Sequence, residues 1–207
     1  MQRFVFFVVL MALLVAPLAA QAPAGWQVRV DRSQNFEDPD DVPELMVMTM
    51  GNGFHVKGGP AGVFWNPTNR ATGDFTAKAS FTLLEPSSHT NYYGLTFGGA
   101  DLASDAQKYV YFLVAQNGNF LIKWRNGDEV GDIVASTPNA AIRTPGADGR
   151  STNMLEVRVA GNTISYVVNG TVVHTTPKSG ATAVTDGVVG VRVNHVLSVQ
   201  VDDFEVG

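Results

Sequence analysis

The sequence contains no cysteine in its 207 residues. This absence excludes a disulfide framework and a lipid anchor on an N-terminal cysteine, so the packed core alone must stabilise the fold. Charged side chains are also scarce, at 16% of residues, and the net charge is −5. An acidic chain with only 14 lysines and arginines has no excess positive charge to attract nucleic acid or an anionic membrane, so neither is an expected partner.

Recognisable catalytic and metal-binding motifs are absent as well. The sequence contains no G-x-S-x-G nucleophile elbow and no phosphate-binding P-loop. The histidines do not lie at a spacing typical of metal ligands, and there is no cysteine to assist them. No catalytic residue can therefore be assigned, and no metal site is predicted. The histidines are His55, His89, His174 and His195.

The N-terminus has the pattern of a secretory signal peptide. Arg3 supplies the positive charge, Phe4–Val15 is an apolar run, and Ala19, Ala20 and Ala22 are small residues suited to cleavage. An apolar run of this length is too short for a membrane span of about 20 residues, although an uncleaved anchor helix is the alternative. We expect cleavage after Ala20 or Ala22, a secreted or periplasmic protein of bacterial type, and no membrane insertion after cleavage.

Beyond this leader, the sequence is a series of short strands and turns. Alternate residues from Phe75 to Leu83 are apolar, and the same period of two recurs in 154–159 and 164–168. Asn169-Gly170 favours the positive φ angles of a tight hairpin turn. No segment outside the leader has a helical period. The pattern predicts an all-β fold of two antiparallel sheets, arranged as a sandwich or jelly roll.

The same reading divides the chain into three parts. Residues 1–20 are the expected signal peptide, and residues 21–44 are an N-terminal strand and an acidic loop that belong to the domain. Residues 45–207 form the jelly roll itself. Within it, residues 137–151 are a long loop rich in proline, glycine and alanine, and long loops are often functional or mobile.

Several blocks of sequence resemble a known family. Gly73–Phe75 and Tyr93–Phe97 are similar to the G-D-F and S-G-I-x-F-R blocks of concanavalin A-like jelly rolls. Residues 45–206 resemble the lectin, glucanase and laminin G group, and are most similar to the bacterial 3-keto-disaccharide hydrolase domain. The resemblance implies a concanavalin A-like jelly roll and a carbohydrate or glycoconjugate as partner. Later blocks agree with it: Asn153–Val159, Ile164–Val173 and Gly190–Val206.

The departures from this family argue against catalysis. Gly98 stands where the S-G-I-x-F-R block has an arginine, and the E-x-D-x-x-E strand of glucanases is absent. Its nearest fragment contains Glu129 and Asp132, which are three residues apart and would point to opposite faces of a strand. Retaining glycosidases need two carboxyl groups about 5 Å apart. We therefore expect a non-catalytic carbohydrate-binding protein. The alternatives are a glycoside-cleaving hydrolase or lyase of the 3-keto-disaccharide hydrolase type, and a structural or protein-interaction module.

One sheet face carries the candidate binding residues. In the expected hairpin of 109–115 and 120–124, alternation places Phe120, Ile122 and Trp124 in the core and leaves tyrosines and cations on the other face. Aromatic rings flanked by hydrogen-bond donors suit sugar recognition, although the tyrosines could instead merely cover the sheet. The predicted ligand-binding residues are Tyr109, Tyr111, Lys123 and Arg125, with Tyr92, Arg192 and His55 at the margins of the face.

Two acidic runs, Glu37–Asp41 and Asp202-Asp203, are the remaining candidates for chemistry. Carboxylate oxygens on a loop could hold calcium. Neither run has the D-x-D-x-D-G spacing of a calcium loop, so a solvated acidic loop is the favoured interpretation. No cofactor is predicted, although the acidic runs would allow calcium.

Overall fold

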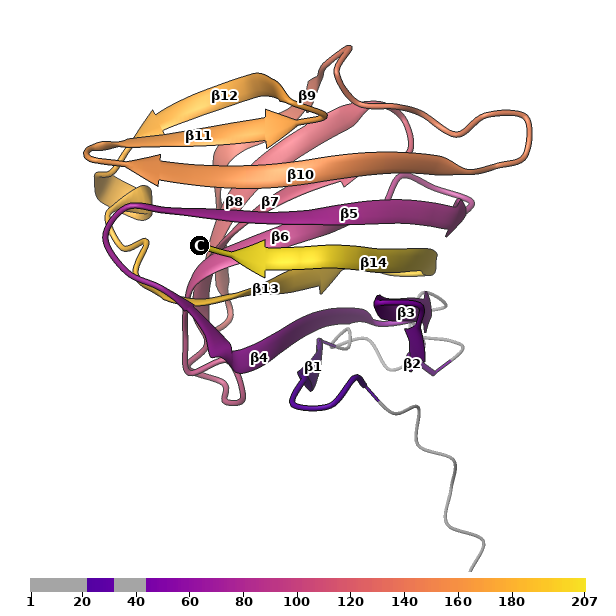
Figure 1. Cartoon of the computed structure of the whole chain (residues 1–207), viewed down its shortest axis with the longest axis horizontal. Coiled ribbons are helices and arrows are strands. Elements are labelled where there is room, and N and C mark those ends of the chain that lie inside the picture. The colour runs from indigo at the N-terminus through magenta and orange to yellow at the C-terminus, as the bar shows by residue number, and fades with distance from the viewer. Residues whose placement is uncertain (1–21, 32–43) are drawn as a thin grey trace, which may run out of the picture.

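The computed structural model describes residues 22–31 and 44–207 and shows two antiparallel β-sheets packed face to face (Figure 1). The all-β jelly-roll sandwich predicted from the sequence is confirmed. The expected signal peptide of residues 1–20, its cleavage site after Ala20 and the acidic run Glu37–Asp41 lie outside the described residues. Ala22, at the alternative cleavage site, is the first described residue and packs against the core. In the described part of the chain, no helix is long and apolar enough to cross a membrane.

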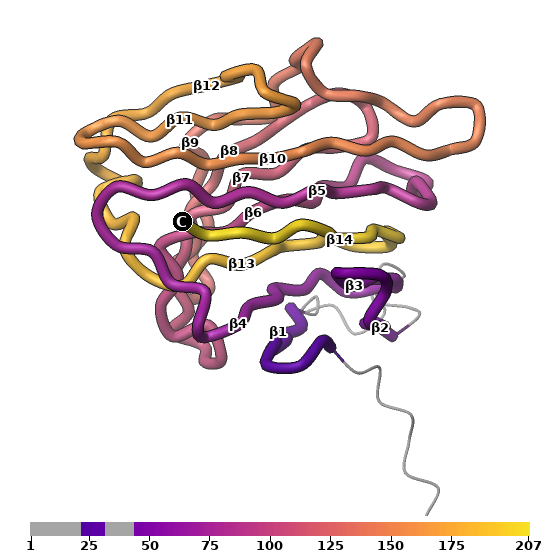
Figure 2. Tube along the Cα trace, in the orientation of Figure 1, coloured from indigo at the N-terminus to yellow at the C-terminus, as the bar shows by residue number. Residues whose placement is uncertain are grey.

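Each sheet has seven strands, and the chain passes repeatedly between the sheets, as its trace shows (Figure 2). Sheet A contains, in spatial order, β1 (Gln27–Asp31), β4 (Ala61–Ala71), β13 (Gly187–Val193), β6 (Tyr92–Ala100), β7 (Lys108–Ala115), β8 (Asn119–Asn126) and β9 (Glu129–Pro138). Sheet B contains β12 (Thr171–Pro177), β11 (Thr163–Val168), β10 (Ser151–Ala160), β5 (Phe75–Glu85), β14 (Leu197–Val206), β3 (Gly53–Gly58) and β2 (Met46–Met50). A 3-10 turn, Gly180–Thr182, precedes β13.

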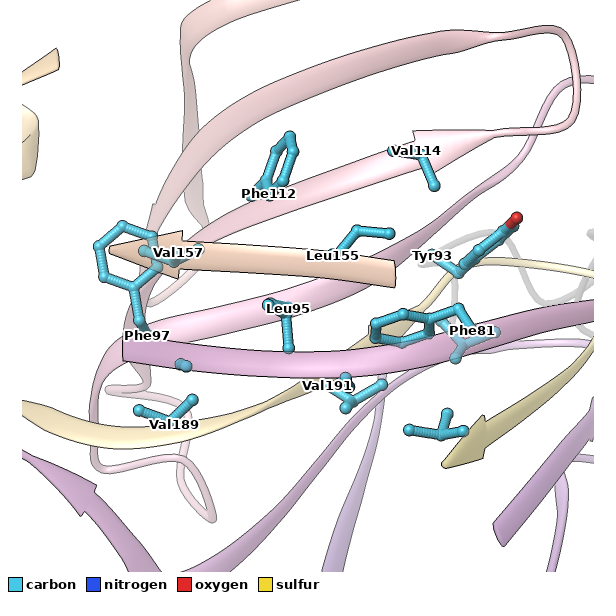
Figure 3. Packing of buried hydrophobic residues seen from close by; sticks show 14 of the residues in the cluster. Phe81, Tyr93, Leu95, Phe97, Phe112, Val114, Leu155, Val157, Val189 and Val191 are labelled. Carbon is cyan, nitrogen blue, oxygen red and sulfur yellow. The ribbon is translucent and has the colours of Figure 1, made fainter. Parts of the chain in front are cut away.

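The main core fills the space between the sheets. On β5 the alternate residues from Phe75 to Leu83 are buried, as the period of two predicts. Figure 3 shows side chains from both sheets meeting in this layer, where they exclude water from a continuous apolar interior. Its labelled members are Phe81, Tyr93, Leu95, Phe97, Phe112, Val114, Leu155, Val157, Val189 and Val191.

Strand β4 contains a proline in its interior. Asn66-Pro67 does not end the strand, which continues to Ala71. Proline has no N–H to donate to a sheet, so it is tolerated where pairing is irregular. The pairing of β4 with β13 is interrupted at that place, because Trp65 pairs with Gly190 and Arg70 with Val188. Pro67 therefore lies within a bulge, which sequence alone did not predict.

The long loop that precedes β10 is tied to the sandwich by a buried amide. Asn153 is fully buried; its Oδ1 accepts the Arg143 N–H at 2.8 Å and its Nδ2 donates to the Arg143 carbonyl at 3.0 Å. Asn169, in the turn after β11, donates to Asn153 Oδ1 and to the Ala141 carbonyl, both at 2.8 Å. One face of the loop is therefore fixed against the sheet, although its composition suggested mobility or function.

Asn153→Ala should release this loop. The substitution leaves the Arg143 N–H and the Asn169 amide, whose bonds to Asn153 are partly buried, without their shared acceptor. We expect a loss of stability of about 1 kcal/mol or more. Hydrogen exchange at the Arg143 amide should accelerate, and urea unfolding should show the lost stability. Thr152→Ala is the matched control, because the Thr152 side chain is exposed and bonds to Thr82 at the surface. Equal effects of the two substitutions would contradict the anchoring role.

Candidate functional site

The face of sheet A that points away from sheet B carries a second buried cluster; we call it the outer face. Strand parity is as predicted: Val110 and Phe112 enter the main core, whereas Tyr109 and Tyr111 belong to the outer face. Leu102, from the β6–β7 connection, packs with this cluster. The cluster consists of Val63, Trp65, Leu102, Tyr109, Tyr111, Leu113, Leu121 and Val188, with Tyr92 partly buried against it.

Asp31 lies at the centre of the polar part of the outer face. Its Oδ2 accepts hydrogen bonds from Arg192 Nη1 at 2.7 Å and from Arg125 Nη1 at 3.1 Å. Its Oδ1 accepts longer bonds from Arg29 Nε and Gln107 Nε2, both at 3.3 Å. The Asp31 side chain is 7% exposed and that of Arg192 is 10% exposed. Strands β1, β8 and β13 thus place their charged groups around one buried carboxylate.

The electrostatics of this cluster hold it in one charge state. Burial alone would raise the pKa of Asp31, but the Arg192 and Arg125 guanidinium groups lower it below its usual value. Burial would lower the pKa of Arg192, whereas the neighbouring Tyr109 and Asp31 raise it above its usual value. A carboxylate paired in this way is a weak base and a weak nucleophile. The cluster therefore acts as a rigid support that orients arginine and tyrosine side chains.

The structure brings most of the predicted binding residues to this one face. Arg192 Nη1 also donates to Tyr109 Oη at 2.8 Å, and its Cζ lies 5.5 Å from the centre of the Tyr111 ring. Lys123, paired with Tyr111 across β7 and β8, forms an ion pair with Asp132 at 3.0 Å. Arg192 was expected at the margin but lies within the central cluster.

Tyr92 and His55 lie apart from this centre. The Tyr92 hydroxyl is 2.7 Å from that of Ser136, beside β9 on the outer face. His55 belongs to β3 in sheet B, and its Nε2 is 2.9 Å from Ser198 Oγ. The predicted position of His55 beside the tyrosines is wrong, because the first residues of the jelly roll fold into the opposite sheet.

The tyrosine rings are not open for stacking. Tyr109 is 3% exposed and Tyr111 is 6% exposed, so neither ring offers a flat face to a sugar in this conformation. Burial raises the pKa of Tyr111 to about 12, which keeps its hydroxyl protonated. The Tyr111 ring therefore covers the sheet, as in the alternative interpretation of the sequence.

An open cleft of about 430 Å³ lies where β7 begins and β8 ends. Two predicted residues, Tyr109 and Arg125, line it together with Trp124, so we call it the Trp124 cleft. Trp124 was expected in the core, but it is only partly buried and packs at the core's edge. The cleft is lined by Gly98, Ala100, Lys108, Tyr109, Val110, Trp124, Arg125, Asn126, Ala181, Val184 and Asp186.

Local packing fixes the two principal side chains of the Trp124 cleft. A Cβ on Gly131 would lie 2.4 Å from Trp124 Nε1, so the indole lies against β9 in space left by a missing side chain. Arg125 Nε donates to the Gly127 carbonyl at 2.8 Å, while Nη1 is held by Asp31. Sequence analysis missed Asp31, because only the folded chain brings this residue to β8. It also missed the exposed side of Trp124, because the cleft beside this side chain forms only in the folded chain.

Metal binding finds little support in the described part of the chain. No group of three or more histidine, aspartate or glutamate side chains there is arranged to hold a metal ion. Asp202 and Asp203 lie on β14, at an irregularity in its pairing with β5.

Comparison with known proteins places the chain in a fold class. No family model matches the sequence, and no curated protein sequence matches it. Among solved structures, carbohydrate-binding module CBM66 from Bacillus subtilis has a TM-score of 0.62 at 11% identity, over 88% of this chain and 94% of that one. A galectin-like protein of unknown function from Bacillus subtilis has a TM-score of 0.61 at 14% identity, over 87% and 88%.

A catalytic protein shares the same fold. A family 16 endo-glucanase from Bacteroides ovatus has a TM-score of 0.59 at 11% identity, over 88% of this chain and 94% of that one. At such identities the likeness shows the fold alone. The protein is a concanavalin A-like jelly roll, as its sequence predicted, whereas the more specific resemblance to 3-keto-disaccharide hydrolases stays a prediction.

Proposed function

We propose that the protein binds carbohydrate without cleaving it, and that the Trp124 cleft is the binding site. The observation that carries this proposal is a partly exposed indole lining a cleft beside Lys108, Arg125 and Asn126. An aromatic ring packs against the apolar face of a sugar, while fixed donors bind its hydroxyls. Arg125 is preorganised by Asp31, so little order has to be imposed when a ligand arrives.

The distribution of carboxylates favours binding over cleavage. Glycosidases ordinarily use a pair of carboxyl groups flanking the scissile bond. Among the described residues that line the Trp124 cleft, Asp186 is the one carboxylate. Asp31 is nearby through Arg125, but its pairing with two guanidinium groups makes it unsuited to proton transfer.

The wider setting agrees with this proposal. The chain shares its fold with a structure whose name is that of a carbohydrate-binding module and with a galectin-like one. The leader-like segment with Arg3 and the apolar run Phe4–Val15 supports export. We therefore propose a role outside the cytoplasm, with a polysaccharide or glycoconjugate as the partner.

A glycan array followed by calorimetry tests the proposal. With a glycan that the array identifies, Trp124→Ala should weaken binding about fivefold or more, because loss of a stacking ring costs on the order of 1 kcal/mol. Lys108→Ala should also weaken binding while leaving the thermal midpoint unchanged, since Lys108 is exposed. Lys57→Ala is the matched control, because Lys57 belongs to sheet B.

Three results would contradict the proposal. Release of sugar from a 3-keto-glycoside would show an enzyme of the alternative type. Binding that Lys57→Ala weakens as much as Lys108→Ala would place the site elsewhere. If the folded protein bound no glycan on the array, a structural or protein-interaction module would be favoured.

A further inference from the structure

A second cleft, of about 410 Å³, lies at another edge of the sandwich and shares no lining residue with the Trp124 cleft. Figure 1 shows the neighbourhood, where β1 and β4 approach β3. The lining comes from the segment before β1, from β4, and, in sheet B, from β2, the β2–β3 turn, β3 and β14. We call it the Trp26 cleft; the residues used below are Trp26, Asn66, Asn69, Asp202, Asp203 and Glu205.

The cleft contains a fixed aromatic ring. The centre of the Trp26 ring lies 4.8 Å from that of Phe54 and 5.2 Å from that of Phe204, the latter in edge-on geometry. Phe54 is 2% exposed and belongs to the main core, so it holds one side of the indole. Trp26 itself is only partly buried, and a ring so positioned can stack on a sugar at small entropic cost.

The polar groups of the cleft are also arranged by local structure. Asn66 Oδ1 accepts from the backbone N–H and the hydroxyl of Thr68, at 3.0 and 2.8 Å, which turns its NH₂ group away from those partners. Asp203 has a φ of +50°, a left-handed conformation uncommon outside glycine, and lies where β14 departs from regular pairing with β5. Such irregularities re-aim side chains and are frequent at functional sites.

The charge of this lining selects the ligand. Asp202, Asp203 and Glu205 line the cleft, whereas the described lining contains no lysine, arginine or histidine. Glu205 is paired with Lys78 at 3.0 Å, and Lys78 also interacts electrostatically with Asp203. Asp202 accepts a hydrogen bond from Gln200 Nε2 at 3.1 Å. Neither Lys78 nor Gln200 lines the cleft, so the charge of its lining is negative. The carboxylates are not clustered closely enough to hold a metal ion. A bound cation should therefore be an organic one, carried on a molecule that also stacks on the indole.

We propose that the Trp26 cleft binds an amino sugar with a free, protonated amine, such as one unit of a de-N-acetylated polysaccharide. The indole would pack against the sugar ring, the aspartates would accept hydrogen bonds from the ammonium group, and the Asn66 and Asn69 amides would bind hydroxyls. This site is independent of the Trp124 cleft, whose lining cations Lys108 and Arg125 would repel an amine.

Calorimetry at pH 6 and low salt, with a glucosamine tetramer and its fully N-acetylated counterpart, tests this inference. The protein should bind the free-amine tetramer at least tenfold more tightly than the acetylated one. Asp203→Asn should weaken that binding about threefold to fivefold, as expected for loss of one exposed charge pair. Asparagine tolerates the left-handed backbone, so the turn should be kept.

Two control variants separate this site from its alternatives. Asp105→Asn removes an exposed carboxylate outside the cleft; if it weakens binding as much as Asp203→Asn, general attraction to an acidic protein explains the result and overturns the proposal. If Lys108→Ala weakened binding of the free-amine tetramer as much as Asp203→Asn does, the amine would bind in the Trp124 cleft and the proposal would be overturned; failure of one cleft is thereby distinguishable from failure of the other. Equal affinity for both tetramers, or displacement of the free-amine tetramer by millimolar calcium, would also overturn it.

Discussion

Asp31→Asn should destabilise the protein by about 3–5 kcal/mol, although the new residue has almost the same shape. The substitution removes the negative charge that pairs with Arg192 and Arg125, and their side chains are only 10% and 15% exposed. A buried guanidinium without a counter-charge is costly, because the interior replaces little of its lost hydration. Urea unfolding followed by intrinsic fluorescence would measure the change.

The control for this prediction is Asp105→Asn. Asp105 also binds Arg29, at 2.9 Å, but its side chain is 97% exposed. An exposed pair contributes little, so we expect a change below about 0.5 kcal/mol. Comparable losses in the two variants would show that burial of the Asp31 cluster does not determine its effect.

The pH dependence supplies a second measurement on Asp31. Its pKa in the folded protein is lowered from an ordinary value of 3.8, so the folded state prefers the charged carboxylate. The resulting stability is fully present above the unfolded-state value and is lost as the pH falls through the lower folded value. The stability difference between the natural protein and Asp31→Asn should therefore shrink below about pH 4.

Phe112→Ala and Tyr111→Ala should both destabilise the protein, although the two side chains point to opposite faces of β7. Phe112 is fully buried and lies 5.3 Å from the Tyr166 ring centre, so its loss should cost about 3–5 kcal/mol. Tyr111 packs beside Tyr109 and beneath Arg192, and its loss should cost about 1.5–3 kcal/mol.

Thermal and urea unfolding of the two variants would test this view of sheet A. Val172→Ala, at a side chain that is 49% exposed on the edge strand β12, should be nearly neutral and serves as the control. If Tyr111→Ala behaved like Val172→Ala, the outer face would be open in solution, and Tyr111 would again be a candidate for stacking on sugar.

Local pattern in the sequence determined the strands and their faces. The side-chain period of two is a property of an extended backbone, so the alternation in β5 and β10 assigned their core-facing residues without knowledge of the partners. Asn169 and Gly170 have the positive φ angles, +50° and +82°, that their residue types favour. Tyr109 and Arg125 were placed on one face by the same parity, and both line the Trp124 cleft.

Pairings between distant segments were decided by the tertiary structure alone. Asp31 and Arg192 are 161 residues apart, and no local signal relates them. Leu102 covers a sheet face that alternation would leave to solvent, and His55 lies in the opposite sheet from the tyrosines. Periodicity reports which side of its own strand a residue occupies, whereas burial, charge pairing and clefts depend on which other strands and loops arrive there. The packing of the whole chain decides which strands and loops these are. As a result, the face that was predicted to stack on sugar is a second buried cluster, and open clefts lie at its edges.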